Sequence, residues 1–314
     1  MSVVRVCFLG TPDFAAKHLE ALLSDDHYKV VGVVTQPDRP SGRKMQLTPS
    51  PVKELALKNN LEVITPENLR KEPEAFEKIK SWQAEVAVVV AFGQILSQDF
   101  LDSFTYGAVN VHGSLLPKWR GAAPIQRSIE AGDAVTGVCL QRMVRKLDAG
   151  PVIGERRVPL NSEINATELY DRLAVLGCEL LNVELMDYIR GNLAPQTQDE
   201  ALVSMAPKIE KEESLLDFSK SAESLHNKIR AFTMGPGTFV NFQGKRLKIH
   251  KTKVVDSSSA VKPGEVASVS ANELLIQTAK GQLSLLEVQP ESKNRMPIAD
   301  FLKSHHLVKG QSFT

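Results

Sequence analysis

The chain has 314 residues, of which 42% are hydrophobic and 24% are charged, and its formal net charge at pH 7 is +1. This composition is that of an ordinary globular protein long enough for two domains, and it argues against a disordered or membrane protein. The charge is uneven, because residues 1–207 carry a net charge of −4 and residues 208–314 one of +5. A basic C-terminal part suits contact with a polyanion.

The amino terminus and the cysteines exclude further classes of protein. The apolar run Val3–Leu9 is too short to span a membrane and lacks a signal-peptide cleavage site, so we expect a first strand and a cytoplasmic protein. Cys7, Cys139 and Cys178 are odd in number and far apart, which predicts reduced, buried thiols. Histidines, cysteines and acidic residues nowhere show the spacing of metal ligands, so we expect no metal.

Alternating apolar strands and amphipathic helices in the first hundred residues predict an α/β domain. Gly10 stands alone after the first strand, where a dinucleotide-binding fingerprint has three glycines, which disfavours a nicotinamide or flavin cofactor. Uniformly apolar Val86–Ala91 predicts a central strand that is buried on both faces. The other strands expected here are Val3–Leu9, Val30–Thr35 and Leu61–Ile64. One helix is expected to carry Phe14 on its apolar face, a second to begin at Pro51, and a third to end at about Trp82.

Residues 36–50 are a long connection for a compact domain. Arg39, Arg43 and Lys44 make it basic, and its proline and glycine content predicts no regular structure. Composition alone leaves two interpretations open, a loop that grips phosphate and a solvated loop without a partner.

The strand Tyr106–Val111 delivers Asn110 and His112 to its carboxyl end, where parallel α/β sheets bind ligands. Asn110 can donate hydrogen bonds to an oxygen that gains charge, and His112 can exchange a proton near neutral pH. Asp148 lies in a polar turn between the strands expected at Val135–Met143 and Val152–Pro159, from where its carboxylate could orient the imidazole. A donor, a base and an orienting group are the parts needed for acyl-like transfer through a tetrahedral intermediate. Ordinary turn chemistry would also explain these residue types.

The remaining third of the chain predicts a second domain. Leucines at helical spacing predict a long, core-packed helix over Ala166–Arg190, and residues 191–207 have the texture of a linker. Short strands with turn signals then predict a small closed barrel. Lys248 and Lys251 lie on one strand face, which fits either a polyanion site or a solvated surface. The expected strands are Gly237–Phe242, Arg246–Val255, Gly264–Ser268, Glu273–Gln277 and Gln282–Glu287, with helices at Ser221–Ala231 and Pro297–Lys303.

Several motifs together resemble the folate-dependent formyltransferases, in particular the members that act on methionyl initiator tRNA. The two main motifs are His112–Gln126, which reads HGSLLPKWRGAAPIQ, and Asp148–Ile153, which reads DAGPVI. Supporting motifs are Phe8–Phe14, Thr35–Pro40, Pro49–Lys53 and Ala91–Leu96. The resemblance implies a Rossmann-like catalytic domain over 1–190, the linker 191–207, and an oligonucleotide-binding-like barrel over 208–314 that binds tRNA.

The resemblance also implies a reaction and its residues. The enzyme would move the formyl group of 10-formyltetrahydrofolate, its co-substrate, to the α-amino group of methionyl initiator tRNA in translation initiation, as a monomer. Rival interpretations are a formyltransferase acting on a small amine, a formyl-folate hydrolase, and a non-catalytic tRNA-binding module. The implied residues are Asn110, His112 and Asp148 for catalysis; Phe92, Gly93, Ile95, Leu96, Ser114, Leu115, Leu116 and Pro117 for folate; and Arg39, Arg43, Lys44, Lys248 and Lys251 for tRNA.

Overall fold

The computed structural model describes residues 3–41 and 45–314, and the chain divides into two compact units. The first unit is made of Met1–Pro124, Thr136–Val158 and Tyr170–Ala206, and the second of Ile125–Val135, Pro159–Leu169 and Pro207–Thr314. Two short segments from the first 190 residues thus group with the second unit. The boundaries expected from the sequence at 190 and 208 stay a prediction.

A seven-stranded sheet with the order β10-β9-β7-β6-β1-β2-β5 forms the centre of the first unit. Its strands from β7 to β5 pair in parallel, whereas β9 is antiparallel to β7. The predicted Rossmann-like α/β architecture is therefore confirmed. The strands are β1 (Val4–Gly10), β2 (Tyr28–Val34), β5 (Val63–Ile64), β6 (Val86–Val90), β7 (Ala108–His112), β9 (Val135–Arg142) and β10 (Val152–Pro159).

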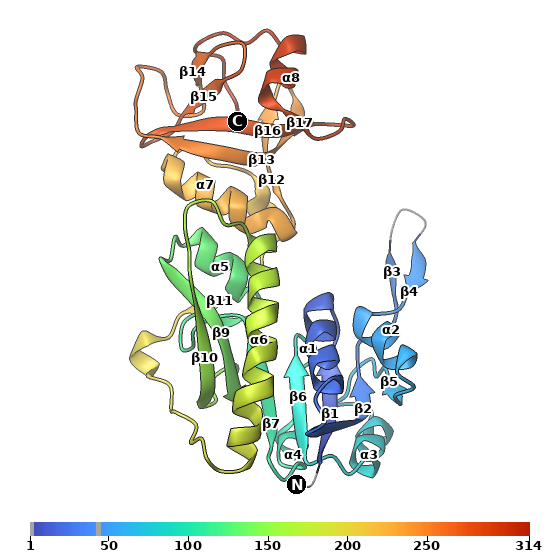
Figure 1. Cartoon of the computed structure of the whole chain (residues 1–314). Helices are drawn as coiled ribbons and strands as arrows, with labels where there is room; N and C mark the ends of the chain where they lie inside the picture. The colour runs from blue at the N-terminus through green and yellow to red at the C-terminus, as the bar shows by residue number, and fades with distance from the viewer. Residues whose placement is uncertain (1–2, 42–44) are drawn as a thin grey trace. The chain divides into compact units, whose positions relative to one another are not determined.

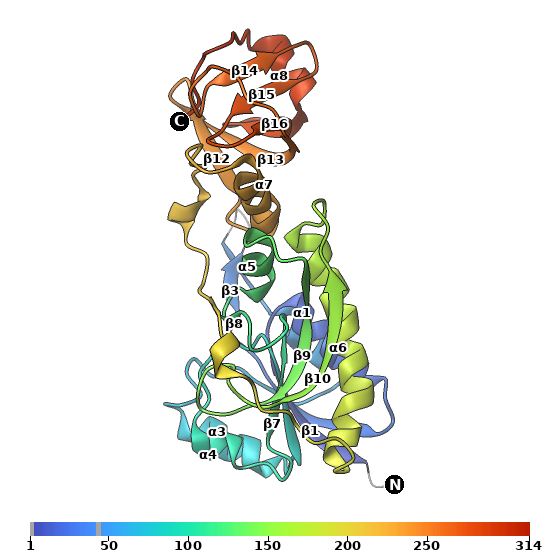
Figure 2. The same cartoon turned by 90° about the vertical axis from the view of Figure 1, so that its left-hand side faces the viewer.

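Helices cover this sheet and bury its apolar side chains. All five residues of β6 are buried between β1 and β7, as the apolar run predicts. α1 packs on β1, β2 and β6, while α6 lies along β9 and β10 in both views (Figures 1 and 2). α2 begins at Pro51 and is capped by the Ser50 hydroxyl, which accepts a hydrogen bond from the Lys53 amide at 3.0 Å. The helices are α1 (Asp13–Leu23), α2 (Pro51–Lys58), α3 (Pro73–Ser81), α4 (Gln98–Leu101) and α6 (Ala166–Ile189).

The strand order reverses between β1 and β6, because β2 and β5 follow on one side and β7 on the other. At this point the Thr11 hydroxyl donates to the Phe92 carbonyl at 3.2 Å. Gly10 is required by close packing, since a Cβ there would lie 2.6 Å from Ala15 Cβ and 2.9 Å from the Val90 carbonyl oxygen. Open α/β sheets bind ligands in the crevice outside such a switch point.

The connection 36–50 contains a short hairpin, so the expectation of no regular structure was wrong. β3 (Arg39–Ser41) pairs antiparallel with β4 (Gln46–Thr48). Pro40 is tolerated because each strand of a two-stranded ribbon has an outer edge that needs no amide donor. Arg43 and Lys44 lie outside the described residues.

An antiparallel sheet with the order β12-β13-β16-β15-β14 forms the second unit, and β17 adds to β16. The C-terminal tail closes it into a barrel: the Val266 amide of β14 donates to the Gln311 carbonyl at 2.9 Å, and the Thr314 amide donates to the Asn241 carbonyl of β12 at 3.0 Å. The sequence predicted a closed barrel, but it did not predict that the C-terminal tail takes part in the closure. The elements are α5 (Pro124–Glu130), α7 (Ala222–Ala231), β12 (Thr238–Phe242), β13 (Lys245–Val255), β14 (Val266–Val269), β15 (Leu274–Gln277), β16 (Gln282–Pro290), β17 (Met296–Pro297) and α8 (Ile298–Ser304).

Candidate active site

Asn110 and His112 project from one face of β7 at its carboxyl end, two residues apart on a strand whose side chains alternate. Asn110 is paired with Gln141 on β9, and His112 with Cys139. Both are buried, at 9% and 6% exposure. Among the described residues the Asn110 carboxamide has no hydrogen-bond partner, so its two N–H groups are available to a substrate oxygen.

The imidazole of His112 has a defined tautomer when it is neutral. Its Nε2 lies 2.9 Å from the carbonyl oxygen of Trp119. A carbonyl can only accept a hydrogen bond, so Nε2 carries the hydrogen and Nδ1 keeps a lone pair. Nδ1 faces Asp148 Oδ2 at 3.8 Å, which is beyond direct hydrogen-bond range. Nδ1 is therefore the basic nitrogen of the site, and it faces a carboxylate.

The Asp148 carboxylate is held by two neutral donors. Oδ2 accepts a hydrogen bond from the Gly121 amide at 2.8 Å, and Oδ1 accepts one from Gln141 Nε2 at 3.2 Å. Asp148 has φ +46°, in the left-handed region that few side chains adopt. These two hydrogen bonds hold the carboxyl group beside the histidine, in the position needed to stabilise an imidazolium.

Gln141 is a site residue that the sequence analysis missed. It is 1% exposed, and its Nε2 contacts Asp148 while its Oε1 is buried without a hydrogen-bond partner in the described chain. The amide orientation is fixed, because the opposite one would set two oxygens against each other. Only the register of β9 against β7 could have revealed this glutamine, and that register is not written in the local sequence.

The residues expected to line a folate pocket divide into buried and accessible groups. Phe92 and Leu96 belong to the hydrophobic core beneath the sheet, whereas Ile95 is 73% exposed and Gly93 is exposed with φ +84°. The loop that carries them is pinned by Gln94, whose Oε1 accepts from the Leu69 amide at 2.8 Å. Of these four residues, Gly93 and Ile95 are therefore the two that a ligand could contact from solvent.

The loop after His112 is rigid for reasons that are visible in its own contacts. Ser114 is fully buried, and its hydroxyl donates to the Lys118 carbonyl at 2.6 Å. Leu116 is buried, while Leu115 and Pro117 are half-buried. The Ser114 hydroxyl therefore shapes the loop, and any contact of these four residues with folate stays a prediction.

A cleft of about 220 Å³ lies where the chain enters and leaves the Asp148 turn. Leu101, Ala108, Met143 and Val144 contribute apolar side chains to its lining. It is lined by Gln98, Leu101, Asp102, Gly107, Ala108, Arg142, Met143, Val144 and Pro151. Three polar side chains, those of Gln98, Asp102 and Arg142, thus lie beside apolar ones in the lining of this cleft.

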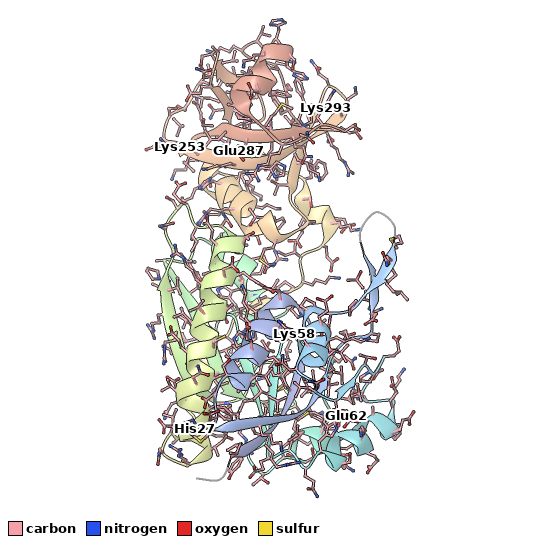
Figure 3. The ribbon with its side chains drawn as sticks, turned by 45° about the vertical axis from the view of Figure 1, so that its right-hand side comes forward. His27, Lys58, Glu62, Lys253, Glu287 and Lys293 are labelled. Carbon is pink, nitrogen blue, oxygen red and sulfur yellow. The ribbon has the colours of Figure 1, made fainter. Side chains whose placement is uncertain are left out.

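The residues expected to contact tRNA are exposed where they are described. Arg39 is exposed on β3 of the first unit, and Lys248 and Lys251 are exposed on β13 of the second. Beside them on the same sheet, the Arg246 guanidinium lies 4.5 Å from the centre of the Phe239 ring. Figure 3 labels Lys253 and Glu287, which mark β13 and β16 on this sheet.

The three cysteines are free thiols, as the sequence analysis expects, but only two of them are buried. Cys7 and Cys139 are buried free thiols and Cys178 is half-buried. Burial raises the pKa of Cys139 to about 12 and that of Cys178 to about 11, so both thiols stay protonated and unreactive at neutral pH. Residues 3–41 and 45–314 contain no cluster of potential metal ligands.

Two family models match the chain, "Formyl transferase" over residues 4–184 and "Formyl transferase, C-terminal domain" over residues 208–306. The chain belongs to the formyl transferase family. Over 313 residues this formyl transferase is 61% identical to the methionyl-tRNA formyltransferase of Bdellovibrio bacteriovorus, an alignment that covers 99% of the chain and 98% of that relative. No helix in the described part of this formyl transferase is long and apolar enough to cross a membrane.

Solved structures share the fold of this formyl transferase. The N-formyltransferase from Helicobacter canadensis, in complex with folinic acid and dTDP-3-aminofucose, has a TM-score of 0.67 at 20% identity and covers 92% of this chain and 100% of its own. Glycinamide ribonucleotide transformylase 1 from Symbiobacterium toebii has a TM-score of 0.53 at 17% identity and covers 63% of this chain and 95% of its own. The second likeness leaves more than a third of the chain uncovered.

Proposed function

We propose that this formyl transferase moves the formyl group of 10-formyltetrahydrofolate to the α-amino group of methionyl initiator tRNA, as a cytoplasmic monomer in translation initiation. The observation that carries the proposal is the 61% identity to a methionyl-tRNA formyltransferase across nearly the whole of both chains. The Asn110, His112 and Asp148 constellation supports formyl transfer, and the net charge of +5 over residues 208–314 supports a polyanionic acceptor.

In the proposed reaction, Asn110, His112 and Asp148 act in the following order. The neutral amine attacks the formyl carbon, and the oxygen of the resulting tetrahedral carbon gains negative charge, which the Asn110 N–H groups stabilise. His112 Nδ1 accepts the proton that the nitrogen loses, and Asp148 stabilises the imidazolium that forms. N10 leaves with the proton that His112 returns, giving N-formylmethionyl-tRNA and tetrahydrofolate. Folate carries the one-carbon unit, while the protein supplies position and electrostatics.

We expect formyl transfer from 10-formyltetrahydrofolate to charged initiator tRNA, with elongator methionyl-tRNA as a poor acceptor. The assay measures N-formylmethionyl-tRNA and tetrahydrofolate together. Formylation of a small amine at equal or higher kcat/KM would support the first rival function, and release of free formate without acceptor would support a hydrolase. Tight tRNA binding without either product would support a non-catalytic module.

Replacing Asn110 with Ala should lower kcat about 10²-fold, the scale of one lost oxyanion donor. The KM for folate should change little, because the lost hydrogen bond strengthens mainly in the transition state. Asn110→Asp should be worse than Asn110→Ala, because a carboxylate repels the developing charge. Single-turnover formyl transfer measures both variants; equal rates for Asp and Asn at this position would remove the donor role.

Replacing Lys248 and Lys251 together with Ala should raise the KM for tRNA and flatten its dependence on salt by about two units of logarithmic slope, one for each lost phosphate contact. The KM for folate should stay unchanged. Lys303→Ala is a matched control, because Lys303 is also an exposed lysine of the second unit, paired with Asp300. An unchanged salt slope in the double variant would show that this strand face is only solvated.

A further inference from the structure

Residues 196–206, here called the strap, cross both loops that hold the catalytic side chains. Gln196 pairs through its backbone with Val152 at 2.7 and 2.8 Å. At the other end β11 (Met205–Ala206) pairs with β8 (Arg120–Gly121). The strap therefore joins the end of the Asp148 turn to residues 119–121, which hydrogen-bond His112 and Asp148. All of these residues belong to the first unit.

Gln198 is the centre of these contacts. It is 8% exposed, and its Nε2 donates to the carbonyl oxygens of Asp148 at 2.8 Å and Gly150 at 2.6 Å. Its Oε1 accepts from Arg120 Nε at 3.0 Å and Nη2 at 2.8 Å. Both N–H groups and both lone pairs of the carboxamide are used, so its orientation is fixed.

Arg120 anchors this network and is itself 2% exposed. Its Nη2 also donates to Glu200 Oε1 at 2.8 Å, and Arg120 together with Lys146 lowers the pKa of Glu200 to about 2. The guanidinium is thus a fixed point inside the unit. The amide of the next residue, Gly121, donates a hydrogen bond to the Asp148 carboxylate.

Gln198 bonds a segment of backbone whose conformation is unfavourable without contacts from other parts of the chain. Asp148 and Trp119 have φ values of +46° and +64°, both in the left-handed region, which is unfavourable for these side chains. Such conformations persist only when surrounding contacts determine them. Gln198 bonds the Asp148 carbonyl, and Ser204 Oγ accepts from the Trp119 amide at 3.0 Å.

We propose that Gln198 is a positioning residue for formyl transfer, whose carboxamide locks the Asp148 turn to Arg120 and so sets the Asp148 carboxylate opposite His112 Nδ1. This inference rests on the catalytic roles proposed for His112 and Asp148. Gln198 touches neither substrate nor reacting atoms. It acts through the two carbonyl groups on either side of Ala149, which its carboxamide links to the guanidinium of Arg120.

Gln198→Glu tests the proposal, because the carboxylate keeps the acceptor for Arg120 and loses the two donors to the turn. We expect kcat in single turnover to fall roughly ten- to a hundredfold, the scale of a displacement of about 1 Å at a catalytic group. The KM values for folate and tRNA should stay within about twofold, while Tm should fall by a few degrees because two carbonyl groups lose their donor. Gln196→Glu is the matched control, since that exposed side chain has one hydrogen-bond partner within residues 3–41 and 45–314, the Ala194 carbonyl.

Each result decides the proposal. A wild-type kcat in Gln198→Glu overturns the proposal. A fall in kcat that is accompanied by equal losses of folate affinity, tRNA affinity and Tm also overturns it, because it would mean a purely structural role. If the Glu variant does not fold, Gln198→Asn replaces it, because the shorter neutral amide cannot span from Arg120 to both carbonyl groups; failure of both to fold overturns the proposal. Near-normal turnover in the His112 and Asp148 variants would instead refute the catalytic roles themselves.

Discussion

Replacing His112 with Ala should lower the single-turnover rate of formyl transfer about 10³-fold, within the range for loss of a general base. Nε2 of His112 donates its hydrogen to the Trp119 carbonyl, so Nδ1 is the ring nitrogen that can accept the amine's proton. KM for folate should change less than kcat. His27→Ala is the control, because His27 is an exposed histidine of the same unit, bonded to Asp25 at 2.7 Å (Figure 3).

Added imidazole should restore part of the rate in His112→Ala and none in the wild-type enzyme. Turnover within tenfold of wild type, with Tm unchanged, would exclude His112 from proton transfer. A large fall in Tm would instead identify the bond to Trp119 as its main contribution.

The sequence predicted the parts of this molecule in which local pattern and burial agree. Five residues of the apolar run at 86–91, Val86–Val90, form β6 and are all buried, whereas Ala91 is exposed. Asn110 and His112 do lie at the carboxyl end of a neighbouring parallel strand. A strand of five buried residues has few alternative placements, because each exposed apolar side chain would cost free energy. Asp148 was brought near His112 as expected, at 3.8 Å.

Contacts between distant segments could not be predicted in this way. Gln198 lies 78 residues beyond Arg120 and has neither periodic neighbours nor a recognisable motif. Residues 191–207 looked like a linker because their backbone is irregular, yet Gln198 satisfies buried carbonyl groups that no local element satisfies. The closing tail at 310–314 escaped prediction for the same reason, since its bonds go to β12 and β14 instead of to a neighbour in sequence.

Asp148→Asn should be the most damaging conservative change in the enzyme, with kcat lowered about 10³- to 10⁴-fold, as when an orienting carboxylate becomes an amide beside a catalytic histidine. Both present partners of the carboxylate, the Gly121 amide and Gln141 Nε2, are donors. An amide at 148 can accept from only one of them without a clash of donors. Gln141 can resolve the clash by turning its amide, because its Oε1 now has no partner in the described chain.

That compensation makes the variant informative, because the turn keeps its hydrogen bonds and loses only the negative charge. We therefore expect Tm within a few degrees of the wild type and unchanged KM values, with the loss confined to single-turnover kcat. The double variant Asp148→Asn with Gln141→Leu should lose stability as well, since one amide donor would then be buried without an acceptor. A turnover within tenfold of wild type in the single variant would mean that formyl transfer does not use the Asp148 charge, and that the imidazolium at His112 is stabilised by the substrates instead.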